Sequence, residues 1–346
     1  MLSKLKNSIN QELVKFTSYI NKRYKLFDTS PLLFNSMMHF ILAKGKRVRP
    51  ILFVIGYKGF TARKPKNLYR SALAIELLHA FLLVHDDIVD NSDMRRGRVS
   101  MHKLMGSKIK RSKKATFSGK DLAMITGDIM YAIAIEAFLS IHEDPIRKEE
   151  ALKKFIETAC YTGCGEFIEL IYSIEDISKI KKDQIYKIYD YKTAYYTFIA
   201  PLVTGAVLAG APKKQIGLLI KFGTSVGRAF QIKDDILGMF EQEKKTGKSG
   251  LSDLQEGKKT ILIWYAYTQS GKQQKNQLKK ILNKNKVTRK DLDIARKIII
   301  DTGSLEYAKT QIKISLKRSS SIIENLQIGQ SYKKALIDYN HTLLDL

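Results

Sequence analysis

Proline and cysteine are scarce in this sequence. The scarcity of proline favours long helices, and the scarcity of cysteine argues against a structural zinc site. Only six prolines occur among 346 residues. Because proline breaks helix interiors, the long stretches without it leave room for long helices. The two cysteines, Cys160 and Cys164, lie one helical turn apart with no histidine nearby in the sequence, so they do not supply the four ligands of a structural zinc site. We expect two reduced thiols on a helix, in a cytoplasmic protein.

Acidic residues are also in short supply, with 34 Asp and Glu against 60 Lys and Arg and a formal net charge of +26. A surplus of this size indicates an anionic partner: nucleic acid, an anionic membrane surface or a phosphorylated substrate. The basic residues form no single tail, and we expect most lysines to lie on solvated faces. They gather in segments 45–50, 95–98, 108–114 and 275–286.

Apolar runs long enough to span a membrane are missing as well. The most apolar segments, 71–84 and 198–211, are interrupted by polar residues or by proline and glycine, and both fall short of ~18 uninterrupted apolar residues. Residues 1–25 lack the apolar core of a signal peptide and have the spacing of an amphipathic helix. We therefore expect a soluble protein.

Apolar residues recur at helical spacing along nearly the whole chain, and alternating strand patterns are hard to find. With 44% hydrophobic residues and no clear linker, the sequence predicts an all-α fold, a single large helical bundle forming one domain over 1–346. Polar loops are expected at 91–119 and 241–257, and an exposed connection at 270–290. The predicted helices cover 71–90, 121–142, 151–173, 184–199, 214–240 and 258–268.

The most informative feature is a pair of aspartate clusters. In HDDIVD at 85–90, Asp86 and Asp90 stand four residues apart and share a helix face, with Asp87 beside them. A helix C-terminus disfavours anions, and carboxylates this close repel one another unless a cation such as Mg²⁺ neutralises them. Asp234 and Asp235 in QIKDDILG again close an apolar helix. Each cluster precedes a basic, glycine-containing segment, which predicts metal ions that hold phosphates.

These motifs resemble those of the trans-prenyl diphosphate synthases, most closely the archaeal-type short-chain enzymes. HDDIVD followed by MRRGR is similar to the first aspartate-rich motif, and QIKDDILG followed by KKTGKSGLSDLQEGKKT to the second. The resemblance continues through AKGKRVRP, IELLHAF, TGD, YKTAYYT and GSLEYAK, and covers about residues 40–310 in order. It implies a helical bundle around a central apolar cavity.

The resemblance also implies a role for each matching residue. Asp86, Asp90 and Asp234 would bind magnesium, several ions to each site, with Asp87 and Asp235 in support. The diphosphate of isopentenyl diphosphate would be bound by Lys46, Arg49, His79 and Arg96. The allylic diphosphate would be bound by Arg95, Lys192, Thr193, Gln231, Lys248 and Lys258. Without the motif around it, His79 would favour the interpretation as a core histidine.

Phe81 and Leu82 occupy the positions whose bulk, in this family, sets the floor of the product cavity. An aromatic at Phe81 resembles enzymes that stop at a C20 product, although Phe81 lies about 140° from Asp86 around a helix, so helical spacing alone does not support this role. The sequence departs from the family at GEFIEL, where Glu166 and Glu169 stand in place of the usual Gln and Asp.

The implied activity is a magnesium-dependent condensation of isopentenyl diphosphate with an allylic diphosphate, giving geranylgeranyl diphosphate. Farnesyl diphosphate or a longer product is the alternative. Because of Glu166 and Glu169, a non-catalytic subunit of a heteromeric synthase is a further alternative. A terpene cyclase would have no use for the isopentenyl-binding residues. A nucleic-acid-binding protein is not expected, because no known motif supports it. The family implies a homodimer, and the charge suggests peripheral contact with anionic membranes.

Overall fold

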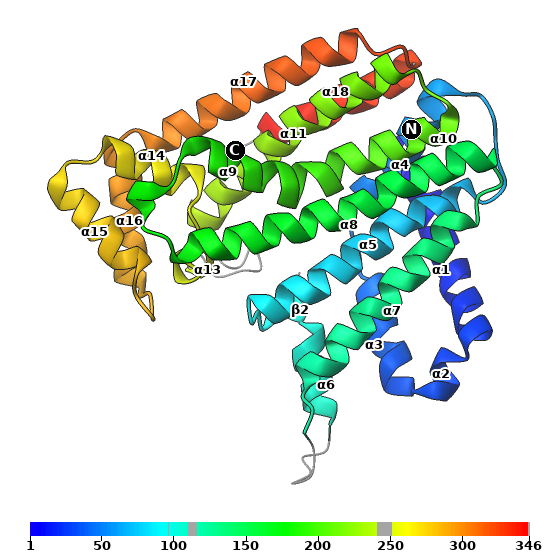
Figure 1. The fold of residues 1–346 in the computed structure, drawn as a ribbon, viewed down its shortest axis with the longest axis horizontal. Helices are drawn as coiled ribbons and strands as arrows, with labels where there is room; N and C mark the ends of the chain where they lie inside the picture. The colour runs from blue at the N-terminus through cyan, green and yellow to red at the C-terminus, as the bar shows by residue number, and fades with distance from the viewer. Residues whose placement is uncertain (96, 110–115, 241–250, 345–346) are drawn as a thin grey trace. The chain divides into compact units, whose positions relative to one another are not determined.

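The computed structural model describes residues 1–95, 97–109, 116–240 and 251–344, and it is helical almost throughout, as the all-α prediction required (Figure 1). The contacts divide the chain into two compact units. Unit 1 comprises 1–156, 200–216 and 327–332, and unit 2 comprises 157–199, 217–326 and 333–346. The expectation of one domain over the whole chain stays a prediction.

Unit 1 is organised around α5 (Leu68–Val89), which packs against α7 (Gly119–Leu139), α4 (Val48–Phe60) and α1 (Leu2–Tyr24). Most of α5 is buried because its apolar residues occur on every side, as expected for a helix in the interior of a bundle. By contrast, α1 buries one face, with Leu5, Ile9 and Leu13 among the buried residues, so the predicted amphipathic helix at the N-terminus is confirmed.

Close backbone contacts hold α4 against α10 (Ala200–Ala209) in unit 1. A Cβ on Gly205 would lie 2.2 Å from the carbonyl oxygen of Phe53, so only glycine allows this approach. The remaining helices of this unit are α2 (Leu26–Thr29), α3 (Pro31–Ile41), α6 (Met101–Lys108) and the first part of α8 (Pro145–Ile174).

The segment 91–119, expected as a loop, contains regular structure among its described residues. Strands β1 (Met94–Arg95) and β2 (Arg98–Val99) form a short antiparallel hairpin, and α6 follows directly. The loop prediction was therefore wrong at 94–95, 98–99 and 101–108. The buried side chains of Met101, His102 and Met105 anchor one face of α6, which packs on α7. The polar sequence concealed this short apolar face.

Unit 2 contains the rest of α8, α9 (Lys182–Ile188), the π-helix η2 (Tyr189–Ile199) and most of α11 (Lys213–Phe240). The helices predicted over 151–173 and 214–240 are thereby confirmed as α8 and α11, and 184–199 is divided between α9 and η2. The other elements are η1 (Ile177–Lys179), α13 (Ser252–Gln255), α14 (Ile261–Gln269), α15 (Lys272–Leu282), α16 (Arg289–Asp301), α17 (Ser304–Glu324) and most of α18 (Gln330–Leu344).

Two segments of this part of the chain that were predicted as connections, 270–290 and 241–257, contain helices. The exposed connection predicted at 270–290 was wrong over 272–282, since α15 occupies these residues and buries Leu278, Ile281 and Leu282, whereas 283–288 is a non-helical connection whose residues are mostly exposed. In the loop predicted at 241–257, residues 241–250 lie outside the described residues, and the rest contains the single-turn helix α13.

One helix in the described part of the chain, α7, is long and apolar enough to cross a membrane by length and composition. The buried helix of a soluble bundle passes the same criterion, and α7 packs along α5 and α6 inside unit 1. Its capped N-terminus, where Ser118 and Asp121 form a reciprocal capping box, is polar.

Candidate functional site

The first aspartate cluster lies at the C-terminal end of α5 in unit 1. Asp86 is half-buried, Asp87 is fully buried and Asp90 is the C-cap residue. Arg95, on β1, reaches back to this cluster: its Nη2 lies 2.7 Å from Asp86 Oδ2, and its Nε donates to Asp87 Oδ1 at 2.6 Å. Burial disfavours the charged guanidinium, but the carboxylates of Asp86 and Asp87 more than offset this and raise the pKa of Arg95.

The guanidinium of Arg95 therefore neutralises part of the negative charge of the first aspartate cluster, for which the sequence predicts a metal ion. Carboxylate oxygens four residues apart on one helix face suit a hard divalent cation, which prefers oxygen ligands and needs few of them from protein. The donor chemistry of Asp86 and Asp90 fits such a cation. The neighbouring Arg96, predicted to bind the isopentenyl diphosphate, lies outside the described residues.

The other three residues predicted to bind isopentenyl diphosphate lie on packed elements of unit 1. Lys46 is exposed just before α4, Arg49 is half-buried in its first turn, and His79 is buried on α5. Arg47, which lies between Lys46 and Arg49, stabilises the fold. Its Nη1 pairs with the buried Glu76 at 2.5 Å, and its Nε donates a hydrogen bond to Asn10. This buried pair ties the basic segment to α5.

Phe81 and Leu82, the predicted chain-length residues, are half-buried on α5, one turn before the first aspartates. The Phe81 ring stacks on Tyr131 of α7 with 5.1 Å between ring centres and lies 4.5 Å from the His85 ring. On α7, Gly127 faces His85, and a Cβ there would lie 2.5 Å from the imidazole. The TGD motif thus brings α7 close to this part of α5.

The second aspartate cluster lies on α11 in unit 2, and its two members differ. Asp234 is exposed, whereas Asp235 is buried and accepts hydrogen bonds from the Tyr189 hydroxyl and from Gln231 Nε2, the latter at 2.9 Å. Burial raises the pKa of Asp235 well above its ordinary value, with Asp253 and Asp234 adding to the effect. Asp234 is therefore the member placed to meet solvent or a ligand, and Asp235 organises the helix behind it.

A chain of hydrogen bonds fixes the predicted ligands Thr193 and Gln231. The Thr193 hydroxyl donates to Gln231 Oε1, and Gln231 donates in turn to Asp235. Tyr189 closes the chain by accepting from the backbone N–H of Ile261 at 2.9 Å. Tyr189 was not singled out from the sequence, where one tyrosine among several in η2 carries no distinguishing pattern.

Lys192 contacts both of the glutamates that depart from the family pattern. Its Nζ lies 2.7 Å from Glu166 and also pairs with Glu169, both on α8. Gly165 makes this contact possible, since a Cβ there would lie 2.7 Å from the Lys192 backbone nitrogen. Gly227 of α11 also packs closely on η2, since a Cβ there would lie 2.3 Å from Ala194 Cβ. The π-helix, a form frequent at functional sites, is thus held between two glycine contacts.

Lys258, the remaining described residue of the predicted allylic set, forms ion pairs with Glu256 and, at 3.8 Å, with Asp253. Its neighbour Lys259 is buried, which lowers the pKa of that amine to about 8, and it donates to the carbonyls of Ser173 and Gly257. Lys248 lies outside the described residues. Within unit 2 the structure therefore brings Thr193, Gln231 and Asp235 together.

Comparison with known proteins gives a consistent result. The family model described as polyprenyl synthetase matches residues 30–299. A short chain isoprenyl diphosphate synthase of Methanocaldococcus jannaschii is 31% identical over 88% of this chain and 84% of its own length. A geranylgeranyl diphosphate synthase of Sulfolobus acidocaldarius is 33% identical over 86% and 85%, and a geranylfarnesyl diphosphate synthase of Aeropyrum pernix is 30% identical over 90% and 92%.

Solved structures show the same fold. The structure of a geranylgeranyl pyrophosphate synthase of Corynebacterium glutamicum, complexed with isoprenyl diphosphate and magnesium, superposes with a TM-score of 0.89 at 23% identity, covering 100% of this chain and 99% of that one. A geranylgeranyl pyrophosphate synthetase of Pyrococcus horikoshii gives a TM-score of 0.82 at 24% identity, covering 100% and 98%.

Proposed function

This chain belongs to the polyprenyl synthetase family, and from that premise we propose that it condenses isopentenyl diphosphate with allylic diphosphates to make geranylgeranyl diphosphate. The observation that carries the proposal is the pair of aspartate clusters, one at the C-terminal end of α5, where Arg95 pairs with Asp86, and one on α11, where Asp234 is exposed. The similarity to short-chain synthases over most of the chain supports it. A farnesyl product or a longer one is the alternative, since the relatives include a geranylfarnesyl diphosphate synthase.

We propose Mg²⁺ as the metal, held by Asp86 and Asp90 and by Asp234. When bound, the metal would neutralise the allylic diphosphate as a leaving group. The protein itself would contribute basic side chains that pair with the diphosphate. Arg95 pairs with Asp86 and Asp87 in this structure, and it would turn to the diphosphate once a cation occupies the aspartates. Lys192, Thr193, Gln231 and Lys258 would bind the same group.

Lys46, Arg49 and His79, with Arg96, would bind the diphosphate of isopentenyl diphosphate. Fixed cations in a site that excludes water stabilise such groups more than the same charges do in solvent. The Arg47–Glu76 pair supports this set, because it anchors the segment that carries Lys46 and Arg49. The allylic C–O bond breaks and diphosphate leaves. The double bond of isopentenyl diphosphate then attacks the allylic cation, and the released diphosphate accepts the proton that is lost.

We also propose a cytoplasmic homodimer that contacts anionic membranes peripherally, where the charge of +26 would assist. Liposome co-sedimentation with no preference for anionic lipid would contradict the membrane contact. The exposed apolar side chains of α8, among them Phe167 and Ile174, support a homodimer.

One observation favours a second candidate function, a non-catalytic subunit of a heteromeric synthase. Lys192 is neutralised by two carboxylates, Glu166 and Glu169, where the family usually has one acid and one amide. A lysine in this state attracts a diphosphate less strongly. The sequence keeps both aspartate clusters and the basic residues proposed to bind isopentenyl diphosphate, and these favour the active enzyme.

The deciding experiment is a condensation assay with radiolabelled isopentenyl diphosphate and C5, C10 or C15 allylic diphosphates, with Mg²⁺ and with chelator. We expect a magnesium-dependent C20 product, and a loss of at least about a hundred-fold in Asp86→Ala and Asp234→Ala. Circular dichroism confirms that these variants fold. No product with any primer would move the assignment to the non-catalytic subunit, and near-normal turnover in either variant would refute the metal ligands.

A further inference from the structure

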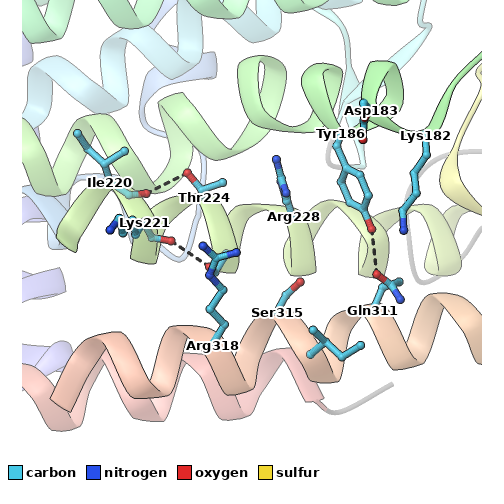
Figure 2. Close-up of a pocket in the computed structure, with 12 residues that line it drawn as sticks. Lys182, Asp183, Tyr186, Ile220, Lys221, Thr224, Arg228, Gln311, Ser315 and Arg318 are labelled. Carbon is cyan, nitrogen blue, oxygen red and sulfur yellow. Dashed lines mark hydrogen bonds between the residues drawn. The ribbon is translucent and has the colours of Figure 1, made fainter. Parts of the chain in front are cut away.

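A second set of cations in unit 2 lies around a cavity that the proposed reaction does not use. The cavity has a volume of about 540 Å³ and is formed by α9, α11 and α17 (Figure 2). Among the residues that line it are Lys182, Lys221, Arg228 and Arg318, four cations from three helices. None of the lining residues belongs to the predicted catalytic or substrate-binding set. The volume lies within the range of ordinary small-ligand sites.

Arg228 is held rigidly beside this cavity. Its Nε and Nη2 donate to the two oxygens of Asp190 at 2.7 and 2.6 Å, and its guanidinium stacks over the Tyr186 ring at 4.7 Å. Asp190 therefore uses two of the five N–H groups of this arginine, and the others remain to donate. A planar guanidinium fixed in this way is pre-organised for a phosphate oxygen.

The other cations are not neutralised within the described part of the chain. There, Lys182, Lys221 and Arg318 form no ion pair, and Asp183 is the one acid in the cavity lining. With the Arg228–Asp190 pair neutral, three positive charges stand against one negative charge, a surplus of two. In Figure 2, Arg318 extends from α17 toward α11, the helix that carries Lys221 and Arg228. Charges converging from separate helices are costly unless an anion joins them.

The neutral groups of the cavity also favour an anion. Gln311 accepts the Tyr186 hydroxyl at 3.2 Å through its amide oxygen, which leaves its NH₂ group to donate (Figure 2). The Thr224 hydroxyl is used differently, since it donates to the Ile220 carbonyl. Ser315 supplies a further hydroxyl. Donors therefore outnumber acceptors among the groups that face the cavity.

We propose that this cavity is a second anion site, which binds a phosphate or diphosphate group through Arg228, Arg318 and Lys221. The group could belong to a free ion or to the headgroup of a lipid, and both present the same chemistry. Asp190, the partner of Arg228, lies on η2 two residues before Lys192, so an anion here would act on the segment that carries a substrate-binding residue.

The test measures protection of individual lysines from acetylation, read by mass spectrometry in the presence of chelator. Saturating inorganic diphosphate should slow the acetylation of Lys182 and Lys221 at least about five-fold. Lys313 and Lys317, on α17 outside the cavity lining, serve as internal controls. Because the readout is local, diphosphate bound at the aspartate clusters does not interfere, and the result is independent of the proposed activity.

Two variants and a lipid arm complete the experiment. Arg318→Gln should abolish the protection of Lys221, and Lys313→Gln, which removes the same charge from the same helix, should leave it intact. Protection by phosphatidylglycerol vesicles and not by diphosphate would support the site and assign the group to a lipid headgroup. Equal acetylation rates with and without both probes would overturn the proposal.

Discussion

At the scale of single residues, Lys192 is the clearest case for a measurable change. Glu166 and Glu169 both pair with its ammonium group, so replacing one of them by glutamine removes a negative charge that would repel a diphosphate. We expect Glu166→Gln to lower the KM for the allylic diphosphate about two- to five-fold, because the lysine can then attract a diphosphate more strongly. Glu157→Gln is the matched control, since Glu157 lies on α8 like Glu166 but accepts a hydrogen bond from Tyr195 of η2. A raised KM in Glu166→Gln would contradict this reading.

Phe81 offers a second test at this scale. Its ring packs between Tyr131 and His85, and its removal would open space beside α7. We expect Phe81→Ala to give products at least about one isoprene unit longer, as judged by chromatography after dephosphorylation. Leu83→Ala is the control for lost volume on α5, because Leu83 lines a pocket with Arg95 and Arg98 that Phe81 does not line. An unchanged product distribution would remove Phe81 as the floor of the product cavity.

The position of a residue could be predicted where it follows from spacing within a motif. The environment of a residue could not be predicted where it depends on a partner distant in the sequence. Asp86 and Asp90 were placed correctly on one face at the end of α5, because spacing alone determines that geometry. The opposite environments of Asp234 and Asp235 could not be predicted, since they depend on Tyr189, which is distant in sequence. The same holds for Arg95, whose contact with Asp86 and Asp87 requires the β1–β2 hairpin.

At the scale of elements, the contact of α8 with η2 is open to a paired test. Gly165→Ala would place a methyl group 2.7 Å from the Lys192 backbone, whereas the space beside Gly163, on the same helix, is open. We expect Gly165→Ala to lower condensation activity about ten-fold by displacing η2. Gly163→Ala should instead stabilise the protein by about 0.5–1 kcal/mol, as alanine favours helices. Thermal unfolding and kcat distinguish the two variants. The same kcat and the same Tm in both would argue against a close contact between α8 and η2.

The start of α16 should make stability depend on pH. Lys284 and the hydroxyl and backbone N–H of Thr288 bond to Asp291 and lower its pKa to about 2. Because the folded pKa lies below the ordinary value of about 3.9, the stabilisation is complete above pH 4 and is lost as the pH falls toward 2.

Asp291→Asn should therefore lower the Tm at pH 7, and its difference from the wild type should shrink below about pH 4. Asp301→Asn, at the exposed end of the same helix, is the control and should have little effect on the Tm. A Tm difference that is constant across this pH range would refute the role of the capping contact.

The elements themselves could be predicted where apolar residues cover most of a helix. α5, α7 and α8 follow directly from that pattern. The error at α15 arose because lysines dominate its sequence, although Leu278, Ile281 and Leu282 stand at helical spacing and are buried. The π-helical form of η2 has no sequence signal that we recognise, since its close contacts come from glycines on two other helices.

At the scale of the whole molecule, the exposed apolar face of α8 is a candidate for the interface of the proposed homodimer. Phe167, Leu170, Ile171 and Ile174 follow helical spacing, and they are 67%, 44%, 44% and 82% exposed. Such an apolar stripe on the surface is unusual for a monomer, and a two-fold axis would let the stripe of one chain cover that of a second. The free thiols of Cys160 and Cys164 lie on the same helix and are exposed.

We therefore expect the wild type to have twice the chain's mass by light scattering, and the double variant Phe167→Asp/Ile171→Asp to have the mass of one chain. A buried carboxylate without a partner costs several kcal/mol, which is enough to dissociate an interface of moderate size. Ile300→Asp is the matched control, because Ile300 is also exposed, at 57%, but belongs to α16 and should leave the mass unchanged. A dimer that persists in the double variant would show that another surface joins the chains, and it would leave the α8 stripe available for the membrane contact proposed above.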